Sequence, residues 1–120
     1  MALGYKKTFG ADGELIASEF LESNGFTIIG KNFVAGRSGE IDIIAIKDKL
    51  LLFVEVKARS SEQYGGGIYS ITDDKKRKLR TSAKFYLVKN PIYNTTEYSI
   101  RFDLIIVKDG SVEWIDDIIR

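Results

Sequence analysis

The sequence contains neither cysteine nor histidine, and these two absences exclude most of the common catalytic groups. Without cysteine there can be no disulfide, thiol nucleophile, zinc–thiolate site or iron–sulfur cluster. Without histidine there can be no Ser-His-Asp triad, imidazole general base or histidine zinc site. The metal ligands that remain are oxygen atoms, which suit Mg²⁺, Mn²⁺ or Ca²⁺.

Long apolar runs and a strong net charge are also lacking. No segment is apolar over the length that spans a bilayer, and residues 1–10 lack the apolar stretch of a signal peptide. We therefore expect a cytoplasmic protein with no membrane partner. The net charge is only +1, so any affinity for nucleic acid has to come from a local patch of basic residues.

The residues that are present predict one folded domain over residues 1–120. Hydrophobic residues make up 44% and charged residues 29%, which is enough for a core with a charged surface. Apolar spacings predict two helices and five strands. The predicted fold class is α/β, with a mixed central sheet flanked by helices in the order α-β-β-β-α-β-β. The expected helices span 12–24 and 72–88, and the expected strands span 26–33, 39–46, 51–57, 100–107 and 112–115.

The second and third predicted strands form a hairpin around a polar turn, for which we assume four loop residues, 47–50. Strand alternation in this register places Asp42 opposite Glu55 and Glu40 opposite Lys57, with Glu55 and Lys57 on one face. Like charges that face each other destabilise a sheet, and a divalent cation would offset the repulsion. The hairpin therefore predicts a metal site.

These charges also have a simpler interpretation, in which they lie on a solvated face and Glu55 and Lys57 form an ordinary ion pair. Residues 50–54 favour the functional interpretation, because they are apolar without a polar interruption. Such a run is typical of a strand buried on both faces. Glu55 and Lys57 then lie at the end of a central strand, where sites gather.

Charged residues on the predicted helices could join this site. Glu14 flanks the apolar stripe of the first helix, although an acidic residue in a first turn is also favourable by itself. Thr72 is expected to cap the second helix. Its apolar stripe, extended backwards, reaches Lys75 and Lys76, which should point toward the sheet. That stripe consists of Leu79, Ser82, Ala83, Tyr86 and Leu87.

The run 75–80 is the strongest concentration of positive charge in the chain. It is either a solvated helix face or a set of phosphate contacts. Residues 58–67 have no periodicity and end in three glycines, which predicts a mobile loop beside the carboxylates. Through Arg59 and Tyr64 this loop either contacts a substrate or simply connects two elements.

The motif Gly39-Glu40-Ile41-Asp42, followed by Phe53-Val54-Glu55-Val56-Lys57-Ala58-Arg59, resembles the signature of the YraN-like family of small bacterial proteins (uncharacterised protein family 0102). That family belongs to the PD-(D/E)XK nuclease superfamily and is similar to archaeal Holliday-junction resolvases. The resemblance covers nearly the whole chain. Val34 departs from it, because the family has a second arginine there. Further matching positions are Gly13-Glu14, Ala17, Asn32, Lys75, Leu79, Ala83, Leu87 and Arg101-Phe102-Asp103.

The resemblance implies a restriction-endonuclease-like fold and a specific set of functional residues. Asp42 and Glu55 would bind Mg²⁺ or Mn²⁺, with the Val56 carbonyl oxygen as a third ligand. Lys57 would be catalytic, and Glu14 would be a supporting carboxylate. The residues that we expect to contact DNA are Lys75, Lys76, Lys78, Arg37 and Arg59.

These observations predict a metal-dependent endonuclease that hydrolyses DNA phosphodiester bonds. Branched, junction or damaged DNA in repair or recombination is the substrate class that the resemblance favours. The alternative is a nucleic-acid-binding module that kept the fold but does not cleave, and a structural or protein-interaction domain is a third interpretation. Formation of a homodimer is left open, although junction cleavage would favour it.

Overall fold

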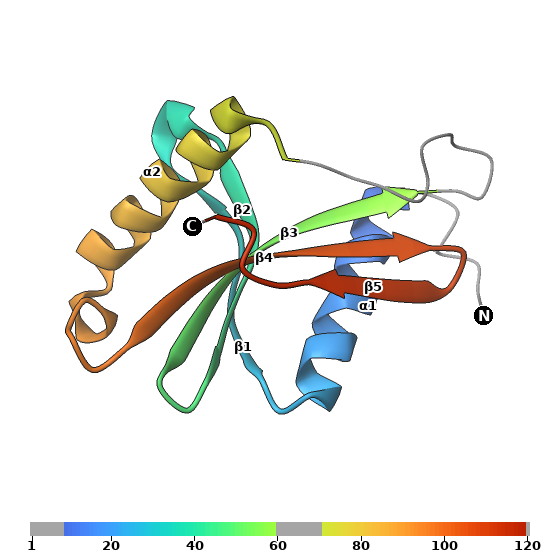
Figure 1. The fold of residues 1–120 in the computed structure, drawn as a ribbon, viewed down its shortest axis with the longest axis horizontal. Coiled ribbons are helices and arrows are strands. Elements are labelled where there is room, and N and C mark those ends of the chain that lie inside the picture. Colours follow the sequence, from blue (N-terminus) through green and yellow to red (C-terminus); the bar gives the residue numbers. More distant parts are fainter. Residues whose placement is uncertain (1–8, 60–70, 120) are drawn as a thin grey trace.

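The structure, a computed structural model, describes residues 9–59 and 71–119, without the side chains of residues 9–12, 38 and 59. Its helices and strands follow the predicted order α-β-β-β-α-β-β, which confirms the α/β fold class (Figure 1). The elements are α1 (Phe9–Ser23), β1 (Thr27–Val34), η2 (Gly36–Ser38), β2 (Glu40–Lys47), β3 (Leu50–Arg59), α2 (Asp73–Lys89), η3 (Pro91–Tyr93), β4 (Ser99–Lys108) and β5 (Ser111–Ile115).

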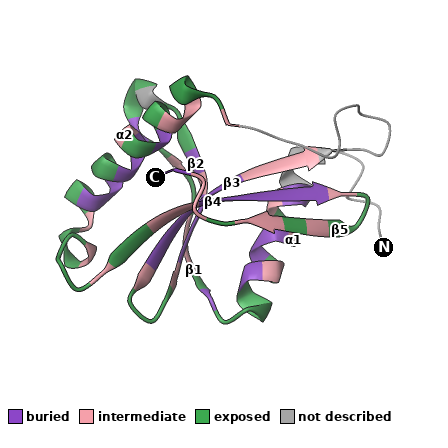
Figure 2. Ribbon diagram, viewed as in Figure 1, coloured by how far each residue is buried: buried purple, intermediate pink, exposed green. Residues whose placement is uncertain are grey.

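The five strands form one mixed sheet in the order β1-β2-β3-β4-β5. Only β3 and β4 are parallel, and the chain between them contains α2. The two helices lie on different sides of the sheet in Figure 1, and each packs on its own cluster of buried residues. Residues 51–54 of β3 are therefore buried on both faces, as predicted, and Figure 2 shows the buried residues concentrated on the central strands.

The β2–β3 hairpin has the predicted register but a shorter turn. Ile44 pairs with Phe53, and the turn consists of two residues, 48 and 49, rather than four. The ladder ends at the pair of Ile43 and Val54. Asp42 and Glu55 are therefore not a ladder pair, which corrects the prediction that they face each other in the sheet.

Gly13 has no Cβ atom, and this allows α1 to lie close to β3. The helix begins at Phe9, three residues before the predicted start, and Ala17 and Leu21 are fully buried. A Cβ atom added at Gly13 would lie 2.9 Å from the Cβ atom of Ala58. Real Cβ atoms essentially never approach so closely, so only glycine fits at this contact.

The predictions for α2 are confirmed. The Thr72 hydroxyl accepts a hydrogen bond from the Lys75 N–H at 3.1 Å and caps the helix. The predicted stripe from Leu79 to Leu87 is buried. Among the described residues, neither helix combines the length and the apolar character that crossing a membrane would take.

The segment that follows β5 is held on the sheet by Asp103, whose side chain is fully buried. Its carboxylate accepts hydrogen bonds from Arg101 Nε at 2.9 Å and Nη2 at 2.8 Å, and from Trp114 Nε1 at 2.8 Å. The Asp117 N–H donates a fourth at 2.9 Å. A buried carboxylate with a cation and four donors is compensated, so we assign Asp103 a structural role.

Candidate active site

The candidate site begins where β2 and β3 separate. Asp42 is the first residue of β2 beyond the last ladder pair, and its Oδ2 accepts a hydrogen bond from the Val56 N–H at 2.8 Å. The side chain of Asp42 thus takes the backbone donor that a continued ladder would have used. This hydrogen bond fixes the carboxylate at the opening between the strands.

Three carboxylates converge at this opening. Glu14, Glu40 and Asp42 each contribute an oxygen atom, and these oxygens all lie within 4.8 Å of one another. Glu14 comes from α1, and the close contact at Gly13 holds that part of the helix against β3. Glu40 was not predicted as a site residue, although strand alternation already placed it on the same face as Asp42.

Asn32 joins the carboxylates from β1, across from Asp42 in the strand register. With its amide nitrogen facing them, its side chain donates to Glu40 Oε2 at 3.0 Å and to Glu14 Oε1 at 3.1 Å. Its φ of 52° lies in the left-handed region, which is unusual for a residue other than glycine. This backbone conformation sets the direction in which the Asn32 side chain leaves the strand. The sequence marked Asn32 only as a position that matches the family.

The surroundings of Asp42 raise the pKa of its carboxyl group from 3.8 to about 7. Burial is the largest cause, and the charges of Glu55, Glu14 and Glu40 add to it, while the Val56 hydrogen bond acts in the opposite direction. Near neutral pH this carboxyl group is therefore poised between its two protonation states. A cation among the carboxylates would compete with the proton.

Glu55 lies beside this cluster and has different partners. It is only 4% exposed, and its Oε2 lies 3.4 Å from both Lys57 Nζ and Lys75 Nζ. The structure confirms that Lys75 points toward the sheet. The site therefore combines a group of crowded carboxylates with a buried carboxylate held by two lysines.

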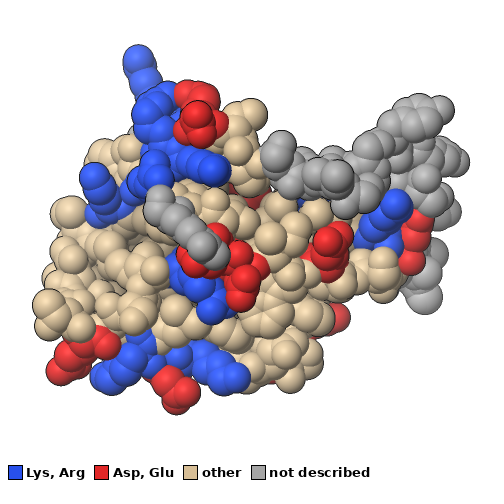
Figure 3. Space-filling model, in the orientation of Figure 1, with Lys and Arg blue, Asp and Glu red and all other residues tan. Residues whose placement is uncertain are grey.

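The other predicted DNA contacts are spread around the start of α2. Lys76 is partly buried next to Lys75, and Lys78 lies 3.5 Å from Asp74. Arg37 is exposed on η2. Figure 3 shows Lys and Arg side chains gathered over α2. The side chain of Arg59 and the loop residue Tyr64 lie outside the described residues.

The donor atoms fit a hard divalent cation. The three clustered carboxylates form no ion pair with any Lys or Arg of residues 9–59 and 71–119 for which side chains are described. Each contributes an oxygen atom within 4.8 Å of the other two, and carboxylate oxygens are the ligands that Mg²⁺ and Mn²⁺ prefer, so these three residues could hold such an ion. Val56 contributes its N–H to the site, and the role of its carbonyl oxygen stays a prediction.

Comparisons with known proteins agree in pointing to one family. A family model described as "Uncharacterised protein family UPF0102" matches residues 13–107. A UPF0102 protein of Clostridium perfringens is 46% identical over 84% of this chain and 80% of its own length. A UPF0102 protein of Francisella tularensis is 41% identical over 88% and 89%. One from Sulfurovum is 38% identical over 93% and 94%.

Proposed function

We propose, from the premise that this chain belongs to the uncharacterised protein family UPF0102, that it is a metal-dependent endonuclease acting on DNA. UPF0102 is the YraN-like family, so the resemblance of the sequence motifs is confirmed. The family's description names no activity, and the proposal therefore depends on the site. Its main support is the convergence of Glu14, Glu40 and Asp42 beside a buried Glu55 that contacts two lysines.

The clustered carboxylates would bind Mg²⁺ or Mn²⁺. When bound, the metal lowers the pKa of a water molecule and stabilises the charge of the transition state. Asp42 is oriented for this by the Val56 N–H, and Glu14 and Glu40 are oriented by Asn32. Glu55, whose Oε2 contacts both lysines, would supply a further oxygen ligand beside this cluster.

The two lysines would act on the phosphate. Lys57 and Lys75 each contact Glu55, yet more than a third of each side chain is exposed to solvent. Their ammonium groups can therefore also reach an incoming phosphate oxygen. We assign Lys57 to the scissile phosphate or the attacking water, where it stabilises developing negative charge. Lys75 would hold the phosphate from the other side.

The substrate that suits this arrangement is DNA. Lys76, Lys78, Arg37 and Arg59 would contact phosphates outside the reacting group, because clustered cations provide affinity without a basic whole protein. Branched, junction or damaged DNA, and a role in repair or recombination, are part of the same proposal. Cleavage of both strands at a junction would require two copies of the chain.

Cleavage assays test this function. Wild type should cut at least one DNA in a panel of linear, nicked and branched substrates with Mg²⁺ or Mn²⁺, and EDTA should stop the reaction. Asp42→Asn, purified identically, should be inactive and also controls for contaminating nucleases. If wild type cuts none of these DNAs, or if Asp42→Asn cuts as fast as wild type, the endonuclease proposal is wrong.

A nucleic-acid-binding module that does not cleave is the second candidate. The observation in its favour is that two lysines of the protein itself already compensate the charge of Glu55. Such a module would bind DNA through α2 but would cut nothing in the same panel. The three carboxylates favour the endonuclease proposal, because negative charges beside the surface that contacts DNA phosphates do not help a protein that only binds DNA.

A further inference from the structure

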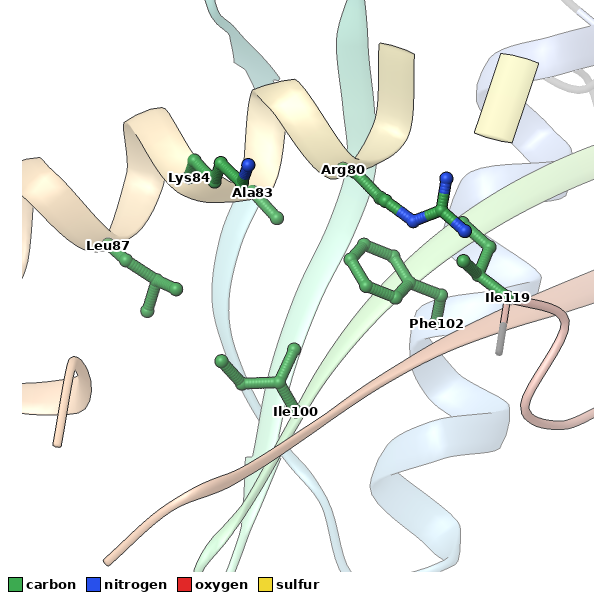
Figure 4. Close-up of a pocket in the computed structure, with 7 residues that line it drawn as sticks. All are labelled: Arg80, Ala83, Lys84, Leu87, Ile100, Phe102 and Ile119. Atoms are coloured by element: carbon green, nitrogen blue, oxygen red, sulfur yellow. The ribbon is translucent and has the colours of Figure 1, made fainter. Parts of the chain in front are cut away.

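A groove of about 350 Å³ lies between α2 and the first half of β4. Phe102 in this groove pairs in register with Phe53, which lies two residues before Glu55 on the same face of β3. The groove therefore lies on the same side of the sheet as the lysines that hold Glu55. Figure 4 shows its lining, which includes Arg80, Lys84, Leu87, Ile100, Phe102 and Ile119.

The cations beside this groove form a stripe along α2. Lys76, Arg80 and Lys84 are spaced four residues apart, so they lie on one helix face, where like charges repel. Within the ranges that the structure describes, no carboxylate lies within 4.0 Å of any of the three, whereas Arg77 and Lys78 both pair with Asp74. An external anion would relieve this repulsion.

The stripe continues into the candidate active site. Lys76 follows Lys75, which contacts Glu55. Lys84 lies nine residues after Lys75, which is about 13.5 Å along the helix and matches roughly four nucleotides at 3.4 Å each. One strand of a polyanion can therefore contact the groove and the active site together.

The floor of the groove is apolar and partly open. Phe102 is held by stacking on Phe53 at 5.5 Å between ring centroids, and Ile100 is 41% exposed. A ligand that suits the groove needs flat apolar groups joined to regularly spaced negative charges, which describes a nucleic-acid strand. In a duplex the bases are stacked and paired inside the helix, so only an unpaired base can reach such a floor.

We propose that this groove receives an unpaired base of the DNA substrate, while Arg80 and Lys84 contact the phosphates on either side of it. The substrate would then carry a single-stranded segment next to the scissile phosphate. This inference rests on the proposed function and specifies its substrate class. The competing occupant is an acidic peptide with a hydrophobic side chain.

Binding of fluorescent DNA to the full chain in EDTA tests the groove without cleavage. The probes are a short thymidine strand, an abasic strand of the same length and the matching duplex. The thymidine strand should bind about tenfold more tightly than the other two, because stacking of a base contributes on that scale. Ile100→Ser should remove most of this difference, whereas Val88→Ser, on a 72% exposed residue of α2 that does not line the groove, should leave it unchanged.

Arg80→Gln provides a second variant that does not depend on core packing. It should weaken binding of both the thymidine and the abasic strand about threefold and lower the salt dependence, while Lys89→Gln on the same helix changes neither. Equal affinity for the three DNAs, or a tenfold preference that Ile100→Ser leaves intact, would overturn the inference. So would an acidic leucine-containing peptide whose binding depends on Ile100 when binding of the DNA does not.

The two proposals fail in different ways. A wild type that cuts DNA but binds thymidine and abasic strands equally well overturns the groove alone. Base-dependent binding that requires Ile100, in a protein that cuts nothing, supports the groove as a binding site and overturns the endonuclease proposal alone.

Discussion

Asp42 is both held in place and crowded by negative charge, and its titration should therefore influence folding. The pKa of its carboxyl group is raised from 3.8 to about 7 in the folded protein. Between these pH values the folded state keeps a proton that the unfolded state has lost. The contribution of this group to the free energy of unfolding is thus fully present below about pH 4 and is lost as the pH rises to about 7. Above that pH the free energy of unfolding no longer changes through this group.

The measurement is urea unfolding of metal-free protein at a series of pH values. Wild type should lose up to about 1.4 kcal/mol of unfolding free energy per pH unit between roughly pH 4 and 7 relative to Asp42→Asn. Asparagine keeps an oxygen that can accept from the Val56 N–H, so the variant removes the charge and little else. Parallel pH profiles for the two proteins would show that folding does not raise the pKa of Asp42.

A bound metal ion should offset the loss of stability that the crowded carboxylates cause. At pH 8 in EDTA, Asp42→Asn should be as stable as wild type or more stable by up to about 4 kcal/mol, because the crowded and partly buried charge is gone. Added Mg²⁺ or Mn²⁺ should raise the unfolding temperature of wild type and do much less for the variant. A less stable variant with an undiminished metal response would make Asp42 a structural acid.

Lys57 should separate metal binding from catalysis. Its ammonium group contacts Glu55 but is not a metal ligand. Lys57→Ala should therefore lose most of the turnover while Mn²⁺ affinity, measured by calorimetry, stays nearly the same. An equal fall in rate and affinity would mean that Lys57 mainly positions the carboxylates.

At the scale of the elements, the site depends on how closely α1 approaches β3. Gly13→Ala places a methyl group 2.9 Å from the Cβ atom of Ala58, so the start of α1 has to move and to carry Glu14 with it. We expect weaker Mn²⁺ binding and slower cleavage, although alanine favours the helix itself by about 1 kcal/mol. Because Ala58→Gly removes the opposing methyl group, the double variant should recover Mn²⁺ affinity. If Gly13→Ala binds Mn²⁺ as tightly as wild type does, the geometry of the site does not depend on this contact.

The hairpin shows how far strand alternation predicts such a site. Alternation placed Ile44 opposite Phe53, and it grouped Asp42 with Glu40 on one face. It did not predict that the pairing of β2 with β3 stops between Ile43 and Asp42, because this depends on a side chain that takes the place of a ladder partner. The hydrophobic pattern is the same whether or not the ladder continues.

The sequence did not predict the roles of two site residues, Glu40 and Asn32, and the reasons are related. Glu40 was visible on the correct face, but its importance depends on Glu14, which comes from a helix that is distant in sequence. Asn32 acts through a left-handed backbone conformation that no periodicity reveals. In contrast, the Thr72 cap and the α2 stripe were predictable, because capping and amphipathic spacing are local properties.

At the scale of the whole molecule, charges of opposite sign are sorted within a chain whose net charge is +1. Glu14, Glu40 and Asp42 converge beyond the part of β2 that pairs with β3, while cations line α2. Under the proposed function, this sorting would let a nearly neutral protein bring a phosphate and a divalent cation together where the two groups of charges adjoin.

DNA binding should therefore depend on salt through a few identifiable residues. Lys75→Ala should weaken binding and lower the slope of log affinity against log salt by about one, as expected for the loss of one phosphate contact. Lys89→Ala, in the last turn of α2, is the matched control and should leave the slope unchanged. If the two variants behave alike, Lys75 serves Glu55 and not DNA.

The most direct test of the metal-dependent endonuclease is the single-turnover cleavage rate of a branched DNA measured against Mn²⁺ concentration at pH 8. We predict that the wild-type rate saturates at the concentration where calorimetry shows the carboxylate site to be filled, and that Asp42→Asn shows neither the binding nor the rate. A wild type that binds Mn²⁺ fully yet leaves every DNA intact, or an Asp42→Asn variant that cuts at the wild-type rate, would contradict this account.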